Sequence, residues 1–392
     1  MATSMSRPPL GPGRIVVDLA AIRANARLLR ATAGVPVVAV VKADGYGHGA
    51  LASARAARQG GADWIGTATV EEALALRAGG IEGPLLCWIG GPEADYAAAA
   101  AGGIDVSAHS VGQLDVMAAA FGGRTHPARV QLKLDTGMSR AGAGRGEWAA
   151  LFARAAEGEA AGTWRITGIW THPACADEPE HPANDRQEQA FREALALAHA
   201  HGLRPELRHF ANSATALLRP SARFDAVRCG IALYGLDPAP GQATDIGLMP
   251  AMTVHAPLTL VKDLAPGDAV SYGHRWVAEQ ATTVGLVPVG YGEGIPRHAS
   301  SPGAAHQATV GVGGKLRPVR GTICMDQFVV DLGGDRPEVG SDVVVLGPPG
   351  AGGPTAQDWA EAAGTINYEI VTRIGGRMTR TYLHELDEQD GA

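Results

Sequence analysis

Cysteine, charge and long apolar runs are all scarce in this chain of 392 residues. The four cysteines, Cys87, Cys175, Cys229 and Cys324, form no CxxC pair, so we interpret them as buried small apolar residues of a reduced, cytoplasmic protein. The longest β-branched apolar run, Val35–Val41, is far shorter than the ~20 residues of a membrane helix. The N-terminus also lacks the apolar stretch of a secretory signal. We therefore expect no membrane association.

The lack of excess basic charge and of metal-ligand spacings excludes two further classes of function. The net charge of −7 leaves no basic surplus for nucleic-acid binding. No spacing of Cys, His and acidic residues is typical of a metal site, so we interpret His181, His199 and His201 as surface residues. At 46% hydrophobic residues, the chain is nevertheless apolar enough for a globular protein with a sizeable core. Its length suggests two domains of about 150 residues or one large barrel with an addition.

The first part of the chain alternates between short β-like runs and stretches with helical spacing. The runs begin near Val35, Asp63, Pro84, Gly103, Ala128, Arg165, Glu206 and Ala226. Thr69, Ser110 and Ser213 are suitable N-caps for the helices between them. About eight strand–helix units favour an α/β fold with a (β/α)8 TIM-type barrel over residues 1–244, with an open doubly wound sheet as the alternative.

The pattern of segments changes after about residue 244, where stretches with helical spacing become rare. Strand-like runs separated by Gly, Pro and Asp turns dominate, and one helix is expected at TAQDWAEAAG. We predict a second, mostly β domain over residues 245–392, with which the first residues of the chain could pack. In a parallel barrel, functional residues follow the C-terminal ends of the strands. Those positions hold Lys42, Lys133, Asp135, His172, His209, Asn212, Ser213, Arg228 and Gly230.

Lys42 ends an otherwise apolar run. Partial desolvation there lowers the pKa of a lysine and favours the neutral amine, which forms Schiff bases with aldehydes. The alternative is a structural lysine whose stem is buried and whose ammonium reaches solvent. The glycines that follow, in DGYGHGA, fit a dinucleotide fingerprint with Asp63, but polar residues separate them from the strand and Asp63 starts the next strand instead of ending it.

The residues that follow the last two predicted barrel strands indicate a phosphate-binding site. ANSAT (211–215) is a strand-end turn that leads into a helix, where backbone N–H groups can bind an anion. Arg228-Cys229-Gly230-Ile231 ends the next strand, and its glycine allows a close approach to a ligand. Barrels often bind phosphate at these two loops. A phosphate there and an aldehyde-binding lysine at the first strand together describe pyridoxal 5'-phosphate (PLP).

The segment VVKADGYGHG (40–49) resembles the PLP-lysine signature of the alanine racemase family. LKLDTGMSRAG, GIWTH, ANSA, VRCGIALYG, VSYG, GYGEG, ICMDQ and TINYE extend the resemblance, in order, over nearly the whole chain. It implies a PLP-containing barrel, a C-terminal β domain, a homodimer with shared active sites, and racemisation of L-alanine and D-alanine, which supplies D-alanine for peptidoglycan.

The resemblance also implies roles for single residues. Lys42 would anchor PLP and act as one base, and Tyr272 would be the other base, supplied by the partner subunit. The remaining implied roles are phosphate binding for Tyr46, Asn212, Ser213, Gly230, Ile231 and Tyr368; contact with the pyridine nitrogen for Arg228; contact with the phenolic oxygen and the substrate for Arg140; a link from Arg228 to Tyr272 for His172; substrate carboxylate binding for Met325; the substrate entrance for Tyr291 and Asp326; and carbamylation for Lys133.

Three departures and several rivals accompany the resemblance. The family commonly has Asp where Glu293 stands, Arg where Thr322 stands and Phe where Pro173 stands, which bears on substrate range and dimer contacts. A broad-specificity or serine racemase is the main alternative function, because a pocket discriminates by only ~1–3 kcal/mol per methylene. A PLP-dependent decarboxylase would usually place an acid where Arg228 stands, and a non-catalytic PLP carrier would lack the C-terminal domain.

Overall fold

The computed structural model describes residues 11–385 except 124, 243 and 301–306. Chain contacts divide it into two units, one of residues 22–249 and one that joins the residues before 22 to those from 250 onward. The division falls a few residues beyond the expected one at 244, and the N-terminal residues belong to the second unit.

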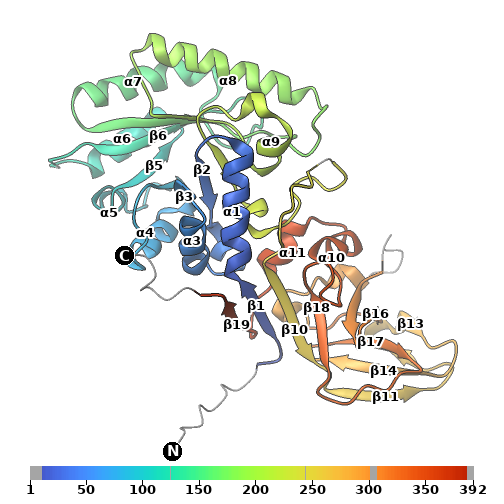
Figure 1. The fold of residues 1–392 in the computed structure, drawn as a ribbon. Helices are drawn as coiled ribbons and strands as arrows, with labels where there is room; N and C mark the ends of the chain where they lie inside the picture. The colour runs from blue at the N-terminus through green and yellow to red at the C-terminus, as the bar shows by residue number, and fades with distance from the viewer. Residues whose placement is uncertain (1–10, 124, 243, 301–306, 386–392) are drawn as a thin grey trace, which may run out of the picture. The chain divides into compact units, whose positions relative to one another are not determined.

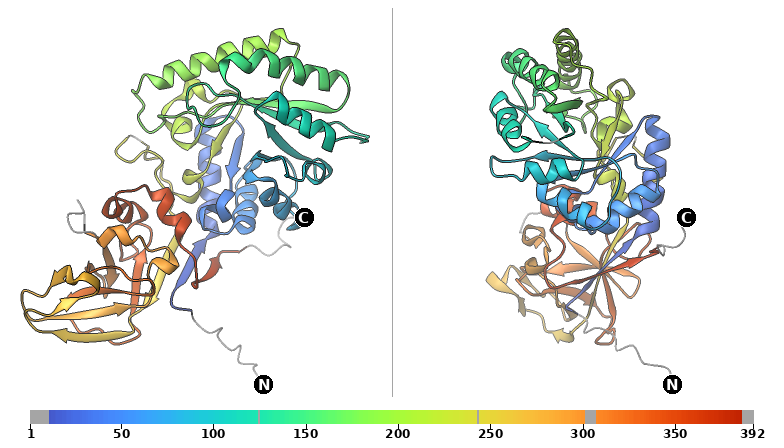
Figure 2. Two further views of the ribbon diagram at one scale, coloured as in Figure 1. Left: turned by 180° about the vertical axis from the view of Figure 1, so that it is seen from behind. Right: turned by 90° about the vertical axis from the view of Figure 1, so that its left-hand side faces the viewer.

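The first unit is built on eight parallel strands with the helices outside them (Figures 1 and 2). The sheet order is β8-β7-β6-β5-β4-β3-β2-β9, and backbone hydrogen bonds from Asp225 to Arg208 (3.0 Å) and from Arg228 to Ala211 (2.9 Å) link its two ends. The predicted barrel is therefore confirmed, in a nearly closed form. The strands are β2 (Val37–Val40), β3 (Trp64–Thr69), β4 (Leu85–Ile89), β5 (Ile104–Ala108), β6 (Ala128–Lys133), β7 (Trp164–Trp170), β8 (Leu207–His209) and β9 (Val227–Cys229).

Helix starts in this unit follow the capping chemistry of the sequence. Thr69 accepts a hydrogen bond from the N–H of Glu72 and forms a full capping box, and Ser110 caps its helix by accepting from the N–H of Gln113. Ser213 is not a cap: Asn212 accepts from Thr215 N, and Ser213 is the first helical residue. The helices are α1 (Leu19–Ala33, which begins in the second unit), α3 (Ala50–Gln59), α4 (Val70–Ala78), α5 (Tyr96–Ala101), α6 (Val111–Ala120), α7 (Trp148–Ala160), α8 (Ala183–Ala200) and α9 (Ser213–Leu218).

The second unit is mostly β, as predicted. Its nine-stranded sheet includes β1, which pairs antiparallel with β10 and parallel with β19, so the N-terminal residues do pack here. TAQDWAEAAG forms α10 (Ala356–Ala363), but a second helix, α11 (Asn367–Arg373), was not predicted. The sheet order is β11 (Leu260–Leu264), β14 (Thr282–Val287), β17 (Phe328–Gly333), β16 (Lys315–Arg320), β15 (Thr309–Val312), β18 (Asp342–Leu346), β10 (Met252–Pro257), β1 (Arg14–Asp18) and β19 (Thr379–Leu383), beside a hairpin of β12 (Ala269–Val270) and β13 (Trp276–Val277).

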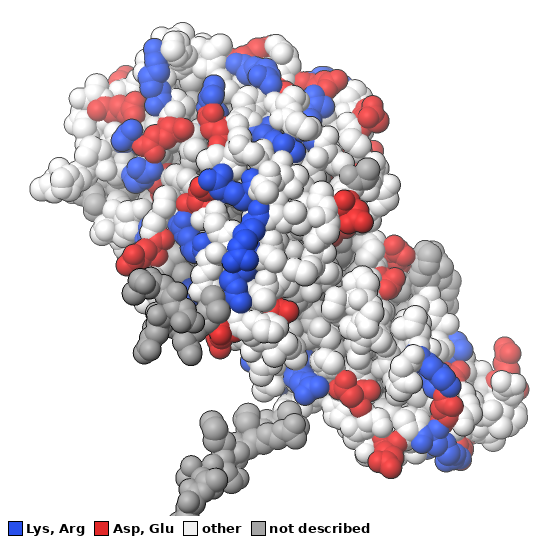
Figure 3. All heavy atoms as spheres, in the orientation of Figure 1, with Lys and Arg blue, Asp and Glu red and all other residues white. Residues whose placement is uncertain are grey.

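The cysteines differ from the expectation in part. Cys87 and Cys229 are buried, and burial raises the pKa of both thiols to about 12, but Cys175 and Cys324 are only half-buried because they lie in loops. All four carry free thiols. Within the described residues, no helix is long and apolar enough to span a membrane. On the face in Figure 3, acidic and basic side chains are interspersed.

Candidate active site

Lys42 directly follows β2 and begins a left-handed turn. Ala43, Asp44 and Gly45 all have φ and ψ between 42° and 62°, and Tyr46 also has a positive φ of 52°. Three of these four residues carry a Cβ, which makes left-handed backbone unfavourable by ~1–2 kcal/mol per residue. Strain of this kind persists only where the surroundings enforce it, and it concentrates at functional sites.

Side-chain hydrogen bonds hold this turn in place. Glu72 accepts from the backbone N–H of Ala43 at 2.8 Å, and Asp44 accepts from Ala50 N at 2.9 Å. Asp44 thereby ties the turn to the start of α3, and Glu72 ties it to α4. The ammonium nitrogen of Lys42 lies 5.9 Å from the ring centres of both Tyr46 and Trp88. The turn thus presents Lys42 between two aromatic rings.

The electrostatic environment of Lys42 favours its neutral form. Burial lowers the pKa of the amine first, and the positive charges of Arg140 and Arg228 lower it further, against an opposing effect of Glu72. Arg228 itself is only 4% exposed. Burial lowers the pKa of its guanidinium to about 9, which leaves it protonated at neutral pH. Lys42 therefore fits the predicted role of a nucleophile and base.

Arg228 is held by hydrogen bonds on both terminal nitrogens. Nη1 donates to Nδ1 of His209 (3.0 Å), and Nη2 donates to Nδ1 of His172 (3.1 Å) and to the carbonyls of Thr171 (2.8 Å) and Phe210 (3.1 Å). Because arginine only donates, both histidines accept at Nδ1 and carry their proton on Nε2. Burial and the nearby guanidinium lower the pKa of both imidazoles well below the usual range, so both are neutral.

A chain of hydrogen bonds continues from His209 across the barrel interior. Nε2 of His209 donates to Gln131 Oε1 (2.7 Å), and Gln131 Nε2 donates to Asp105 (2.9 Å). Arg129 forms an ion pair with the same carboxylate at 2.5 Å. All members except Arg129 are fully buried, and every bond points from Arg228 toward Asp105. The buried carboxylate therefore makes His209 a stronger acceptor for Arg228.

Lys133 lies at the end of β6, 7% exposed, with its Nζ 4.6 Å from the ring centre of Trp170. Arg228 stacks on the same ring at 4.8 Å. Burial, followed by the charges of Arg228, Arg140 and Lys42, lowers the pKa of Lys133 to about 8. Within the described part of the chain, Arg140 forms no ion pair with a carboxylate. Four basic side chains, those of Lys42, Lys133, Arg140 and Arg228, thus gather here with little negative charge to balance them, and such a cluster favours anionic ligands.

The predicted phosphate loops also meet. The N–H of Gly230 donates to the hydroxyl of Ser213 at 3.0 Å, which joins the loops after β8 and β9. A Cβ on Gly230 would lie 2.3 Å from the phenolic oxygen of Tyr46, so only glycine fits at this position. Ile231 is fully buried and starts a short 3-10 turn, and Asn212 caps α9. These five residues surround a backbone cradle of the kind that binds phosphate.

The β unit presents the other predicted residues on loops. Tyr272 is 74% exposed, Met325 53% and Tyr291 42%, which are high values for large apolar side chains. No described residue accepts a hydrogen bond from the Met325 N–H, which leaves that donor available for a carboxylate. Tyr368 lies half-buried at the start of α11.

Arg377 ties these loops together. It forms an ion pair with Asp326 at 2.7 Å and with the fully buried Glu293 at 2.5 Å. Glu293 also accepts from the N–H of Gly290, where a Cβ would meet the Met325 carbonyl at 2.4 Å. Glu293, a departure from the common family residue, therefore supports the loop that carries Met325 and Asp326.

Several residues of the site carried no signal for a role in the sequence. In the sequence, Trp88, Trp170 and Gln131 resemble ordinary strand residues, and His209 stands out only by its position at a strand end. The alternation along β6 does place Gln131 and Lys133 on the same face, and the two lie in one barrel interior. That spacing was the one available clue to the hydrogen-bonded chain.

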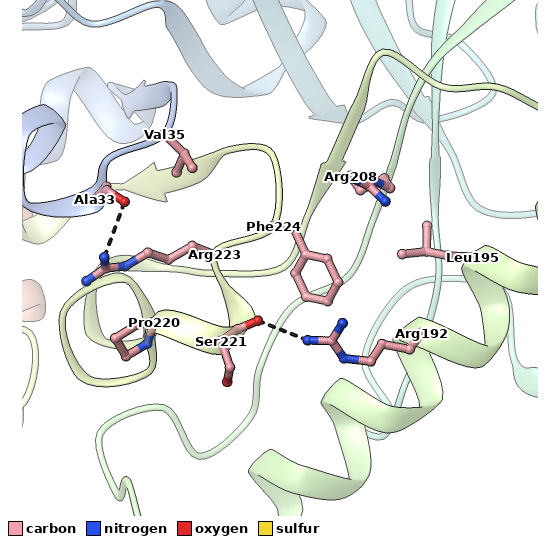
Figure 4. Close-up of a pocket in the computed structure, with 9 residues that line it drawn as sticks. All are labelled: Ala33, Val35, Arg192, Leu195, Arg208, Pro220, Ser221, Arg223 and Phe224. Carbon is pink, nitrogen blue, oxygen red and sulfur yellow. Dashed lines mark hydrogen bonds between the residues drawn. The ribbon is translucent and has the colours of Figure 1, made fainter.

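One cavity in the first unit is lined by none of these residues. It has a volume of about 570 Å³ and is lined by Arg192, Arg208, Arg223 and Phe224, among others (Figure 4). Its arginines already have partners, because Arg192 donates to Ser221 O, Arg223 donates to Ala33 O, and Arg208 forms an ion pair with a carboxylate. Among the described residues there is also no group of three or more His, Cys, Asp or Glu that could hold a metal.

Comparison with known proteins gives a consistent result. Family models described as "Alanine racemase, N-terminal domain" and "Alanine racemase, C-terminal domain" match residues 17–238 and 251–382. The chain is 52% identical to an alanine racemase of Streptomyces coelicolor over 95% of this chain and 96% of that protein. The crystal structure of alanine racemase from a D-cycloserine-producing Streptomyces lavendulae matches with a TM-score of 0.93 and 49% identity, over 97% of this chain and 99% of that one. An alanine racemase structure from E. faecalis matches at 32% identity and a TM-score of 0.85, over 98% of this chain and 100% of that one.

Proposed function

Because this chain belongs to the alanine racemase family and is an isomerase that interconverts L-alanine and D-alanine, we propose that it does so with PLP and two bases, Lys42 and Tyr272. The observation that carries the proposal is the group of Lys42, Lys133, Arg140 and Arg228 at one end of the barrel. No comparison favours a serine or broad-specificity racemase, a decarboxylase or a PLP carrier.

The residues at the barrel end fit PLP. An anionic phosphate suits the cradle of Tyr46, Asn212, Ser213, Gly230 and Ile231, in which a Cβ at Gly230 would collide with Tyr46. Tyr368 would join these phosphate ligands. Lys42 supplies an amine with a lowered pKa for the cofactor's aldehyde. When bound, PLP supplies an electron sink that acidifies the Cα–H bond of the amino acid.

Arg228 would face the pyridine nitrogen. Its Nη atoms are occupied by His209, His172 and backbone carbonyls, and Nε–H is the one donor that no described residue accepts. A fixed positive charge at that point disfavours protonation of the pyridine nitrogen. The electron sink would then be weaker, which would suppress side reactions such as transamination relative to racemisation.

Inversion of a stereocentre needs one base on each face of the substrate. One base removes the α-proton, and the conjugate acid of the other returns a proton on the opposite face. Lys42 serves one face. Tyr272 would serve the other from the partner subunit of a homodimer, with Met325 N–H and Arg140 holding the substrate carboxylate, and Tyr291 and Asp326 at the substrate entrance. The high exposure of Tyr272 and Met325 in a single chain supports an intersubunit site.

Lys133 would be carbamylated. An amine with a pKa of about 8 is partly neutral near physiological pH, and carbamate formation requires the neutral form. The resulting anion would pair with Arg140, which has no carboxylate partner among the described residues.

The wider role of the enzyme would be to make D-alanine in the cytoplasm, where it supplies the synthesis of peptidoglycan.

Borohydride reduction of the PLP-loaded enzyme, followed by peptide mass mapping, tests the cofactor assignment. We expect the pyridoxyl label on the peptide that carries Lys42, and only there. A Lys42→Ala variant, reduced in parallel, should remain unlabelled. Label on another lysine, or none on the wild-type enzyme, would contradict the proposal.

A further inference from the structure

Two reciprocal hydrogen bonds join the loop of Tyr272 to the loop between β16 and β17. The hydroxyl of Thr322 donates to the backbone carbonyl of Tyr272 at 2.9 Å. In return, the hydroxyl of Ser271 donates to the backbone carbonyl of Thr322 at 2.6 Å. Each side chain thus binds the backbone of the other segment, 50 residues away or more in sequence.

The backbone beneath Tyr272 is strained. Ser271 has a φ of 63° and a ψ of −172°, a conformation that residues other than glycine rarely adopt. The two loops also approach closely, since a Cβ at Gly321 would lie 2.5 Å from the carbonyl oxygen of Val270. A segment in this conformation needs contacts that enforce it, and the two hydroxyl bonds are such contacts.

Burial differs sharply between the two ends of this arrangement. Thr322 is only 3% exposed, whereas Tyr272 is 74% exposed. The tyrosine ring therefore gains little from packing against its own chain, and the position of its phenolic oxygen depends on how firmly its backbone is held. The bond from Thr322 acts at that backbone, and it gives a physical reason for threonine at a position where the family commonly has arginine.

We propose that Thr322 is a positioning residue for Tyr272, which it fixes in the orientation for proton transfer. The proposal rests on the proposed role of Tyr272 as a base. Thr322 touches neither substrate nor cofactor in this account. Its loss should leave proton transfer at Lys42 intact and should impair only the step on the opposite face.

Thr322→Val tests this because valine keeps the shape and removes the hydroxyl. The full-length, PLP-loaded enzyme is incubated in D2O with each enantiomer of alanine, and α-hydrogen exchange and racemisation are measured separately. For the enantiomer whose α-hydrogen faces Lys42, we expect racemisation to fall about tenfold, the loss that corresponds to one hydrogen bond. Exchange should fall much less, so the ratio of exchange to racemisation should rise. Thr322→Ser should restore the wild-type ratio.

Two reference variants separate the possible failures. Thr282→Val removes a threonine hydroxyl that bonds to Asp331 in the same unit, and it should leave the ratio unchanged. Tyr272→Phe should raise the ratio more than Thr322→Val does. If Tyr272→Phe leaves the ratio unchanged, the role of Tyr272 as a base is wrong. If Tyr272→Phe raises it and Thr322→Val lowers both rates equally, Thr322 is merely structural. Should Thr322→Val fail to fold, Ser271→Ala, which removes the reciprocal bond, must raise the ratio for the proposal to stand.

Discussion

The two halves of the proposed site are built in opposite ways. In the barrel, Arg228 is 4% exposed and held by neutral histidines and carbonyls, and Lys42 is fixed by a strained turn whose backbone is bonded to Glu72 and Asp44. In the β unit, Tyr272 is exposed on a loop, and among the described residues it is held through its backbone carbonyl, which accepts from Thr322. The barrel half is thus preorganised within one chain, whereas Tyr272 in the other half is open to solvent in a single chain.

Replacement of the buried Arg228 should have the largest effect on the reaction. Arg228→Glu places an acid where the barrel holds a fixed cation, which should protonate the pyridine nitrogen of PLP and strengthen the electron sink. We expect racemisation to fall about 100- to 1,000-fold, the usual cost of a lost electrostatic donor. Transamination per turnover should rise, as measured by release of pyruvate and pyridoxamine phosphate. An equal fall of racemisation and transamination would mean that Arg228 is only structural.

A smaller effect should follow from interrupting the series of hydrogen bonds that runs from Arg228 through His209 to Gln131. Gln131→Leu leaves the Nε2–H of His209 without its acceptor and removes one of the donors to Asp105, which keeps Arg129, and an unsatisfied buried group costs ~1–3 kcal/mol. We expect lower thermal stability and a roughly tenfold loss of racemisation, with a changed absorption spectrum of bound PLP. Gln189→Leu, on an exposed helix face, is the matched control and should change none of these. An unchanged absorption spectrum in Gln131→Leu would show that these hydrogen bonds do not influence the bound cofactor.

The smallest effect concerns Lys133 and pH. Its pKa is lowered from 10.5 to about 8 in the folded protein, so an unmodified ammonium disfavours folding below pH 8, and stability should rise between pH 8 and 10.5. A carbamate removes that dependence because it replaces the cation. We expect bicarbonate to stabilise the wild-type protein near pH 8, with a carbamate signal in ¹³C NMR after labelling with ¹³C-bicarbonate. Lys133→Met should show neither, and a wild-type protein without the signal would refute carbamylation.

Local chemistry made much of the barrel predictable. Apolar runs of strand length, N-caps such as Thr69 and Ser110, and polar residues at strand ends are properties of short segments. Two features were predicted wrongly, the N-cap of α9 and the helix α11, and the reasons are not local. Asn212 and Ser213 are both suitable N-caps, and only the tertiary bond from Gly230 to Ser213 distinguishes them. The helix NYEIVTR was missed because its aromatic and β-branched residues favour a strand.

Long-range juxtapositions could not be read from one sequence. The chain through His209, Gln131 and Asp105 joins residues 78 and 26 positions apart, and the bond between Thr322 and Tyr272 spans 50. Neither has a local motif, because barrel closure and loop packing create the contacts. The resemblance to a family supplied roles for Lys42 and Tyr272, but it marked Thr322 only as a departure.

We propose that each active site takes one base from each of two chains. Lys42→Ala and Tyr272→Phe homodimers should each be nearly inactive, and the measurement is the racemisation rate after the two are mixed under conditions of subunit exchange. A heterodimer has one site with both bases and one with neither, so it should recover about half of the wild-type activity. If both bases of a site came from a single chain, mixing would restore no activity, and that result would contradict the account.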